Sequence, residues 1–354
     1  FDVSNVTTMQ GMFLDSPSST GQGPDANDNW FLYWDVSSVT DMSEMFLGTN
    51  FFYIYNNSNE LILNLSSWDT SNVTSMSQMF SGTEIANIGI NNWDVSSVTD
   101  MSQMFYYANN KHLTNYSEFN LDNWDVSSVT DMSRMFEGIG FLGSSLSSWD
   151  VSNVTDMSSM FVPQLYSNEY FSNLSINNWD VSNVTNMGSM FSGSEFNNDI
   201  TSWDVSNVTM MGDMFSNTPF NQPIGNWDVS NVTSMGQMFS FYTNLGNSNT
   251  VSEDVQAGQF NQDISGWNVS SVTFMSGMFS NNLAFNQNIS SWDVSNVTYM
   301  TAMFFVYGQW NYPIPFNQNL SNWNVSNVTY CDSFSEMRVG WSPPQPNFTN
   351  CNPD

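Results

Sequence analysis

Apolar and polar positions follow a pattern that changes its period part-way through a short motif. In residues 149–153, positions 149, 151 and 153 alternate with the polar residues at 150 and 152, which is the spacing of a β-strand. Beyond Thr155, a suitable helix N-cap, Met157, Met160 and Phe161 are spaced as on one face of a helix. The pattern predicts a strand, a tight turn, one short helix or 3₁₀ turn, and a return segment.

The same motif recurs along the whole chain. Trp179 and Trp203 are 24 residues apart, and Trp124 and Trp149 are 25 apart. A fixed period of this length is typical of a solenoid, in which each unit buries its apolar face against its neighbours. We therefore expect about 12 stacked repeats, with a parallel β-sheet on one side and short helices or 3₁₀ turns on the other. The leading tryptophans are at 34, 68, 93, 124, 149, 179, 203, 227, 267, 292 and 323, and a truncated repeat opens at Phe1.

The repeats predict one elongated domain, residues 1–334, followed by a C-terminal cap, residues 335–354. The two cysteines, Cys331 and Cys351, lie at this end of the chain. Two interpretations are open: a disulfide, which requires an oxidising compartment, or two buried thiols in a reducing one. We expect the disulfide, because the open end of a solenoid needs closing.

The motif resembles a known repeat. The stretch 260–279, FNQDISGWNVSSVTFMSGMF, is similar to the 26-residue repeat of bacterial surface proteins, also called BspA-like, and the similarity covers essentially the whole chain. The resemblance implies a leucine-rich-repeat-like, right-handed coil displayed on a cell surface. It implies no catalytic residues. This chain differs in its scarcity of lysine and in its long insertions.

The charge balance limits the class of partner. The chain has three Lys and Arg residues and 33 Asp and Glu residues, which gives a formal net charge of −30. Such a field repels nucleic acids and anionic membranes and attracts cations. No stretch approaches the roughly 20 apolar residues of a membrane span, so we expect no membrane insertion by this segment. The chain opens inside a repeat, which suggests a mature or partial form from which a signal has been removed.

An aspartate follows the leading tryptophan in most repeats. By strand alternation it faces outward, so stacking places a line of carboxylates on the surface. The carboxylates either cap amides of their own turns while water and salt screen them, or bind cations such as Ca²⁺ between neighbouring repeats. We favour capping, because Ca²⁺ loops gather several acidic ligands around one ion. The candidate metal ligands are Asp94, Asp125, Asp150, Asp180, Asp204 and Asp228.

Most repeats also contain Asn-Val-Thr, which is formally a glycosylation sequon. Because Asn153 is in phase with Trp149, we expect its side chain to point inward and to bond the backbone of a neighbouring coil. An inward asparagine cannot carry a glycan. The better glycosylation candidates lie in predicted loops and are Asn56, Asn115 and Asn347.

Six connections between repeats are longer than the rest, and all follow the predicted helix, so they should emerge along one edge. Insertions gathered on one side of a solenoid are commonly its binding face. They are rich in aromatic residues, which supply contact area at little entropic cost. Alternatively, these rings merely cover the edge of the stack. The candidate ligand or assembly residues are Trp30, Phe51, Tyr53, Tyr55, Tyr106, Tyr107, Tyr166, Tyr170, Tyr242, Tyr307, Trp310 and Tyr312.

The sequence favours a non-catalytic extracellular protein. The single histidine, His112, has no partner pattern for nucleophilic catalysis. The first hypothesis is a structural protein that self-associates into a surface layer, sheath or fibre through edge loops and repeat stacking. The alternative is a cell-surface adhesin that binds a host protein or glycan through the loop edge, in either case with Ca²⁺ as a candidate cofactor.

Overall fold

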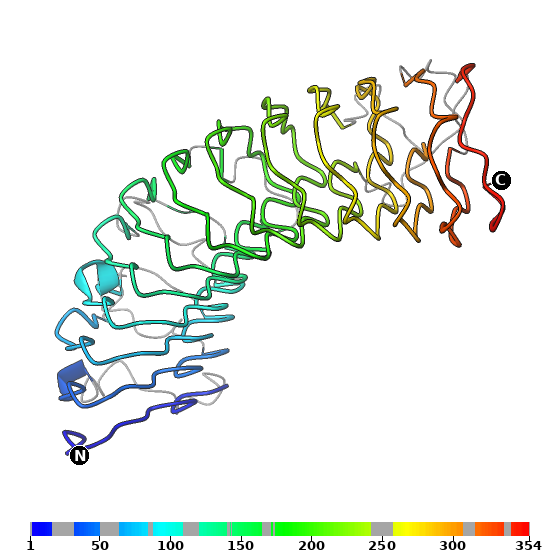
Figure 1. The fold of residues 1–354 in the computed structure, drawn as a ribbon. Helices are drawn as coiled ribbons and strands as arrows, with labels where there is room; N and C mark the ends of the chain where they lie inside the picture. Colours follow the sequence, from blue (N-terminus) through cyan, green and yellow to red (C-terminus); the bar gives the residue numbers. More distant parts are fainter. Residues whose placement is uncertain are drawn as a thin grey trace, which may run out of the picture. The chain divides into compact units, whose positions relative to one another are not determined.

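A computed structural model shows the chain as a succession of coils in two compact units, unit 1 (Phe1–Asp180) and unit 2 (Val181–Asp354) (Figure 1). In the described residues, no helix has the length and apolar character to cross a membrane. The structure describes residues 2–15, 32–49, 64–83, 88–108, 120–139, 142, 144–164, 171–172, 174–241, 258–306, 316–335 and 341–353.

Neighbouring coils are joined by parallel backbone hydrogen bonds. The amide nitrogen of Met132 donates to the carbonyl oxygen of Asp156 on the next coil, at 3.0 Å, and that of Arg134 donates to Ser158, at 2.8 Å. In the opposite direction, the Thr155 amide donates to the Thr130 carbonyl at 2.8 Å. The same pattern recurs from coil to coil within each unit, so the ladder does not depend on any one side chain.

The predicted pairing of coils is confirmed, but its position and extent differ from the prediction. Pairing was expected over residues 149–153, whereas the parallel bridge joins Asp131 to Asp156. In the described residues the pairing consists of isolated bridges and not of extended strands. The alternation at 149–153 has another cause. Asp150 accepts a hydrogen bond from the Ser152 amide, and the resulting turn buries alternate positions without strand pairing.

The short helix or 3₁₀ turn predicted after Thr155 is not confirmed. The Met160 amide donates to the Met157 carbonyl at 3.3 Å, which closes a four-residue turn. Its third residue, Ser159, has φ 55°, the left-handed conformation that a type II turn requires there. One such turn, like a helix, places positions i and i+3 on the same side of the chain. The five residues 157–161 could therefore not distinguish a turn from a helix. The one helix with both ends in the described residues is the 3₁₀ helix η3 (Ile90–Asn92).

The predicted core is confirmed. Aligned side chains of successive coils form columns. Phe80 and Phe105 stack with centroids 5.8 Å apart and planes 3° apart, and Phe105 and Phe136 are 5.9 Å apart at 4°. Trp149 and Trp179 stack at 6.5 Å. Apolar area and ring stacking therefore act together along each unit. Fully buried members of one repeat include Leu146, Val154, Met157, Met160 and Phe161.

The asparagine ladder is present, but the predicted inward orientation is wrong. The Asn153 Nδ2 atom donates to the Ser127 carbonyl oxygen of the preceding coil at 2.8 Å, and the side chain is exposed. Asn207 makes the same bond to Ser182 at 2.7 Å. Because the asparagine lies within the turn that the Val154 amide closes on the Val151 carbonyl, it is on the surface and still reaches the neighbouring backbone.

The predicted disulfide between Cys331 and Cys351 is present, with the Cα atoms 5.9 Å apart and a sequence separation of 20. Cys331 is buried in the coil 316–335. The bond ties residues 341–353 to that coil.

This C-terminal segment reproduces contacts of a further coil. Asn350 Nδ2 donates to the Ser326 carbonyl, as the ladder asparagines do elsewhere. The Trp341 ring lies edge-on to Phe316, with centroids 4.9 Å apart, and to Phe304, at 5.5 Å. Residues 341–353 therefore cover the aromatic columns of the coil 316–335.

The turn assignment can be tested at Ala302, which has φ 54°. Substitution Ala302→Gly should raise the free energy of unfolding by about 1 kcal/mol, because glycine has no Cβ strain in this conformation. In a helix the same substitution would lower it by about 1 kcal/mol. Urea unfolding distinguishes the two signs. Ala108→Gly is the control: Ala108 lacks the positive φ and is buried, so this substitution should destabilise.

Candidate interaction surface

One position of the motif varies while its surroundings stay the same. It is the residue that follows Val-Thr, and its backbone forms the inter-coil bridge. We call this set the bridge column. In unit 1 it consists of Thr8, Asp41, Ser75, Asp100, Asp131 and Asp156, and in unit 2 of Asn186, Met210, Ser234, Phe274, Tyr299 and Tyr330.

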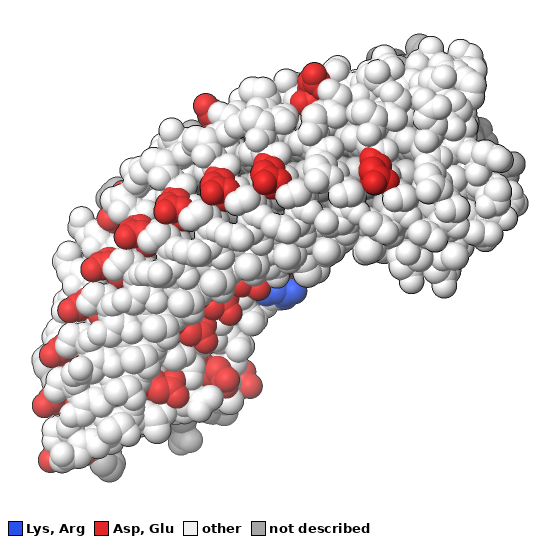
Figure 2. Space-filling model, viewed as in Figure 1, with Lys and Arg blue, Asp and Glu red and all other residues white. Residues whose placement is uncertain are grey.

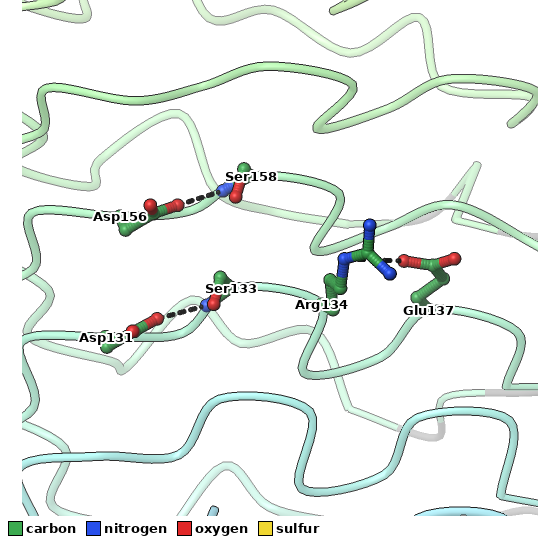
Figure 3. A network of polar contacts seen from close by, with 6 residues as sticks. All are labelled: Asp131, Ser133, Arg134, Glu137, Asp156 and Ser158. Atoms are coloured by element: carbon green, nitrogen blue, oxygen red, sulfur yellow. Dashed lines mark hydrogen bonds and ion pairs between the residues drawn. The ribbon is translucent and has the colours of Figure 1, made fainter. Parts of the chain in front are cut away.

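In unit 1 the bridge column is mostly acidic, and its carboxylates cap their own turns. Asp131 Oδ1 accepts a hydrogen bond from the Ser133 amide at 2.8 Å, and Asp156 accepts one from Ser158 at the same distance (Figure 3). Each of these carboxylates accepts a hydrogen bond from an amide that takes no part in the backbone hydrogen bonds between coils. The acidic column of unit 1 therefore has a structural role.

Beside these caps lies a partly buried ion pair. Arg134 Nε is 3.7 Å from Glu137 Oε2, with the arginine side chain 49% exposed and the glutamate side chain 13% exposed (Figure 3). Oε2 is buried and has no hydrogen-bond partner. Burial therefore raises the pKa of Glu137, and the nearby Arg134 only partly offsets this effect.

In unit 2 the bridge column becomes apolar and aromatic. The rings of Tyr299 and Tyr330 stack 4.6 Å apart at 6°, and Phe274 lies 5.5 Å from Tyr299 at 43°. Tyr299 is 39% exposed, Tyr330 49% and Met210 48%. Soluble proteins seldom expose aligned large apolar side chains without a partner. This column is the strongest candidate for an interaction surface.

A glycine accommodates the phenylalanine ring on this surface. A Cβ atom placed on Gly236 would lie 2.2 Å from Cε1 of Phe274. Any side chain at position 236 would therefore displace the ring from the preceding coil. The lack of a side chain there lets Phe274 lie against the backbone, half-buried.

The outward line of aspartates is confirmed. Acidic side chains are prominent on the face that Figure 2 shows. Asp94, Asp125, Asp150 and Asp180 of unit 1 are exposed, as are Asp204 and Asp228 of unit 2. The expected capping is also confirmed, since Asp228 Oδ1 accepts from the Ser230 amide at 3.0 Å. Hydrogen bonds from the Ser230 hydroxyl and amide lower the pKa of Asp228. Within the described ranges, no group of three or more His, Cys, Asp or Glu side chains could hold a metal ion together.

Most of the predicted loop aromatics lie outside the described residues. Two are described, Tyr106 and Tyr107, and their rings meet edge to face 4.7 Å apart. The Arg134 guanidinium is 6.0 Å from the centroid of the Tyr106 ring, and Tyr107 is 41% exposed. The residues outside the described ranges are Trp30, Phe51, Tyr53, Tyr55, Tyr166, Tyr170, Tyr242, Tyr307, Trp310 and Tyr312.

The predicted glycosylation residues divide in the same way. Asn56 and Asn115 lie outside the described residues, and Asn347 is exposed. The ladder asparagines are also exposed, contrary to the inward orientation expected of them. In Asn207 and its equivalents, the nitrogen that would carry a glycan donates to the neighbouring coil.

The aromatic column of unit 2 was absent from the sequence-based candidates. The signal lay in the alignment of the repeats. The residue after Val-Thr is Asp in four repeats before position 160 and Met, Phe or Tyr in four repeats after position 200. This signal was missed because the predicted helix did not determine whether the side chain at that position is exposed.

A family described as "Mycoplasma protein of unknown function, DUF285" matches the chain in five overlapping stretches, residues 1–59, 27–118, 109–191, 162–257 and 249–338. Together the matches cover almost the entire sequence in tandem and agree with a repeat protein. Neither the curated proteins nor the solved structures gave a match.

The burial of Glu137 makes a pH-dependent prediction. A carboxyl group whose pKa is raised in the folded state destabilises that state when it ionises. The free energy of unfolding therefore falls as the pH rises from the ordinary pKa of 4.5 through the raised pKa of the folded state. Glu137→Gln should therefore raise the melting temperature at pH 7. The difference should disappear below the ordinary pKa, where both forms are neutral.

The control for this experiment is Glu195→Gln, because Glu195 is exposed. Its melting temperature should follow that of the unmodified protein at both pH values. A lower melting temperature for Glu137→Gln at pH 7 would show instead that the Arg134 ion pair outweighs the burial.

Proposed function

The chain belongs to the DUF285 family, and from this premise we propose that it is a non-catalytic, extracellular binding protein whose repeated coils present a variable column of side chains to another macromolecule. The single observation that carries the proposal is the exposure of Met210, Tyr299 and Tyr330 in register. A regular backbone holds these side chains at fixed spacing, as recognition surfaces of repeat proteins require.

The constancy of the surrounding coil supports a role in recognition. The backbone bond into the bridge column is 3.0 Å long at Ser234 and 2.9 Å at Tyr299. The fold therefore accepts a small polar residue and a large aromatic one equally well at this position. Exposed rings at a position that does not need them are best accounted for by binding.

An extracellular location is supported by the disulfide between Cys331 and Cys351, because such bonds persist in oxidising compartments. The likeness of the repeat to BspA-like surface proteins supports the same location, and with it a leucine-rich-repeat-like arrangement of the coils. Both supports are independent of the bridge column.

Self-assembly is the second candidate function. Met12 and Leu14 on the coil 2–15 are 46% and 44% exposed, an apolar surface on which another copy could pack. The net charge of −30 opposes this contact, because like-charged copies repel each other unless cations screen them. Ca²⁺ held along the aspartate line would be one source of such screening.

The binding function is tested by presenting the full chain, immobilised, to panels of extracellular proteins, basic peptides and glycans. The triple variant Met210→Ser, Tyr299→Ser, Tyr330→Ser keeps the net charge and introduces a residue that the column already contains at Ser234. We expect at least one partner class to bind the unmodified chain and to bind the variant at least about tenfold more weakly. A chain that captures nothing, or a variant that binds equally well, contradicts the proposal.

Light scattering coupled to size-exclusion chromatography separates the two candidates. The binding function predicts a monomer of 40.0 kDa in Ca²⁺ and in EDTA. Large assemblies that grow with concentration would favour self-assembly, and their loss in EDTA would assign a role to the aspartate line.

A further inference from the structure

Three aligned rings define the chemistry of the surface in unit 2. We call Phe274, Tyr299 and Tyr330 the aromatic column. Phe274 lies against the backbone of Gly236, while the two tyrosines stack on each other and project into solvent. The 43° tilt between Phe274 and Tyr299 leaves their ring faces splayed, in contrast to the 6° of the tyrosine pair. The column therefore presents ring faces and edges together.

The charges around the column select its ligand. Asp332, two residues after Tyr330, is exposed. In the described part of the chain, Arg134 of unit 1 is the only Lys or Arg residue. An anionic ligand would meet a chain of net charge −30 and no nearby cation in the described residues. A cationic ligand would be attracted.

Aromatic rings beside a carboxylate suit one kind of cation above others. The guanidinium of arginine is planar, weakly hydrated and always charged, so it stacks on tyrosine and forms forked hydrogen bonds with a carboxylate. The ammonium of lysine is a compact, strongly hydrated charge that gains less from a ring face. The combination of Tyr299, Tyr330 and Asp332 therefore favours arginine over lysine.

We propose that the aromatic column of unit 2 binds an arginine-rich segment of another polypeptide. The inference rests on the proposed binding function and specifies its partner. The segment would lie along the column in an extended conformation, with guanidinium groups on the tyrosine rings and beside Asp332. A neutral glycan lacks the charge that this surface attracts.

The test is fluorescence anisotropy with the full chain and three labelled peptides of equal length, which alternate serine with arginine, lysine or glutamine. We expect the arginine peptide to bind several-fold more tightly than the lysine peptide, and the glutamine peptide not to bind measurably. The double variant Tyr299→Ser, Tyr330→Ser should weaken arginine-peptide binding about tenfold, because two exposed cation–π contacts are lost. The net charge is unchanged.

Two further variants distinguish an effect of the tyrosine rings on binding from an effect on folding. Tyr33→Ser removes an aromatic side chain that is 83% exposed and lies outside the column, and it should leave the affinity within twofold. Tyr330→Phe keeps the ring, removes only the hydroxyl group and should also preserve binding. Circular dichroism and the melting temperature of each variant show whether it folds as the unmodified chain does.

Three results would overturn the proposal. Equal affinity of the double variant and the unmodified chain would mean that overall charge alone holds the peptide. Equal affinity for arginine and lysine peptides would remove the role of the rings. Binding of a neutral glycan that the double variant loses, with peptide binding unaffected, would reassign the column to a sugar. That last result would leave the proposed binding function intact, whereas failure to bind any partner class would contradict both.

Discussion

The structure depends on one interaction, the backbone hydrogen bond from each coil to the next. Each bridge places an amide of one coil on the carbonyl of its neighbour, as Met132 does on Asp156. Because these groups belong to the main chain, stacking makes few demands on the outward side chains. It does align them in register, and the buried phenylalanine and tryptophan columns follow from that alignment. Isolated coils would leave both the bonds and the apolar surface unsatisfied.

The same constraint explains how a repetitive chain can carry specific information. The inward positions are fixed by packing, and most polar turn residues are fixed by capping, as at Asp131 and Asp228. The bridge column requires neither: its aspartates cap their turns in unit 1, but the backbone bond between coils also forms at Tyr299, which has no carboxylate. Its composition therefore shifts from carboxylates in unit 1 to rings in unit 2 while the bonds between coils remain the same. Variation at this position reaches the surface directly, which makes it the place where a partner would be distinguished.

The sequence predicted the repeat, the core columns, the disulfide and the outward aspartates, because each depends on periodicity or pairing visible in one motif. It misplaced the strand and predicted a helix or 3₁₀ turn where the chain forms a turn with a left-handed residue. A left-handed backbone conformation at a serine such as Ser159 leaves no signal in the sequence. In addition, one turn has the same i, i+3 spacing as a helix. The orientation of Asn153 failed for a related reason, since strand alternation was extended across a turn. The exposed rings at Tyr299 and Tyr330 had a signal in the aligned repeats, but their exposure became evident only once the position of the bridge was known.

Amide hydrogen exchange measured residue by residue tests the inter-coil ladder most directly. The Met132, Arg134 and Phe136 amides each donate to the next coil, while the intervening Ser133 amide donates to the Asp131 carboxylate. We expect strong protection at the first three and much faster exchange at Ser133, because a side-chain cap opens more readily than a ladder. Uniform protection across 132–136 would indicate a helix, and fast exchange at all four amides would contradict the ladder itself.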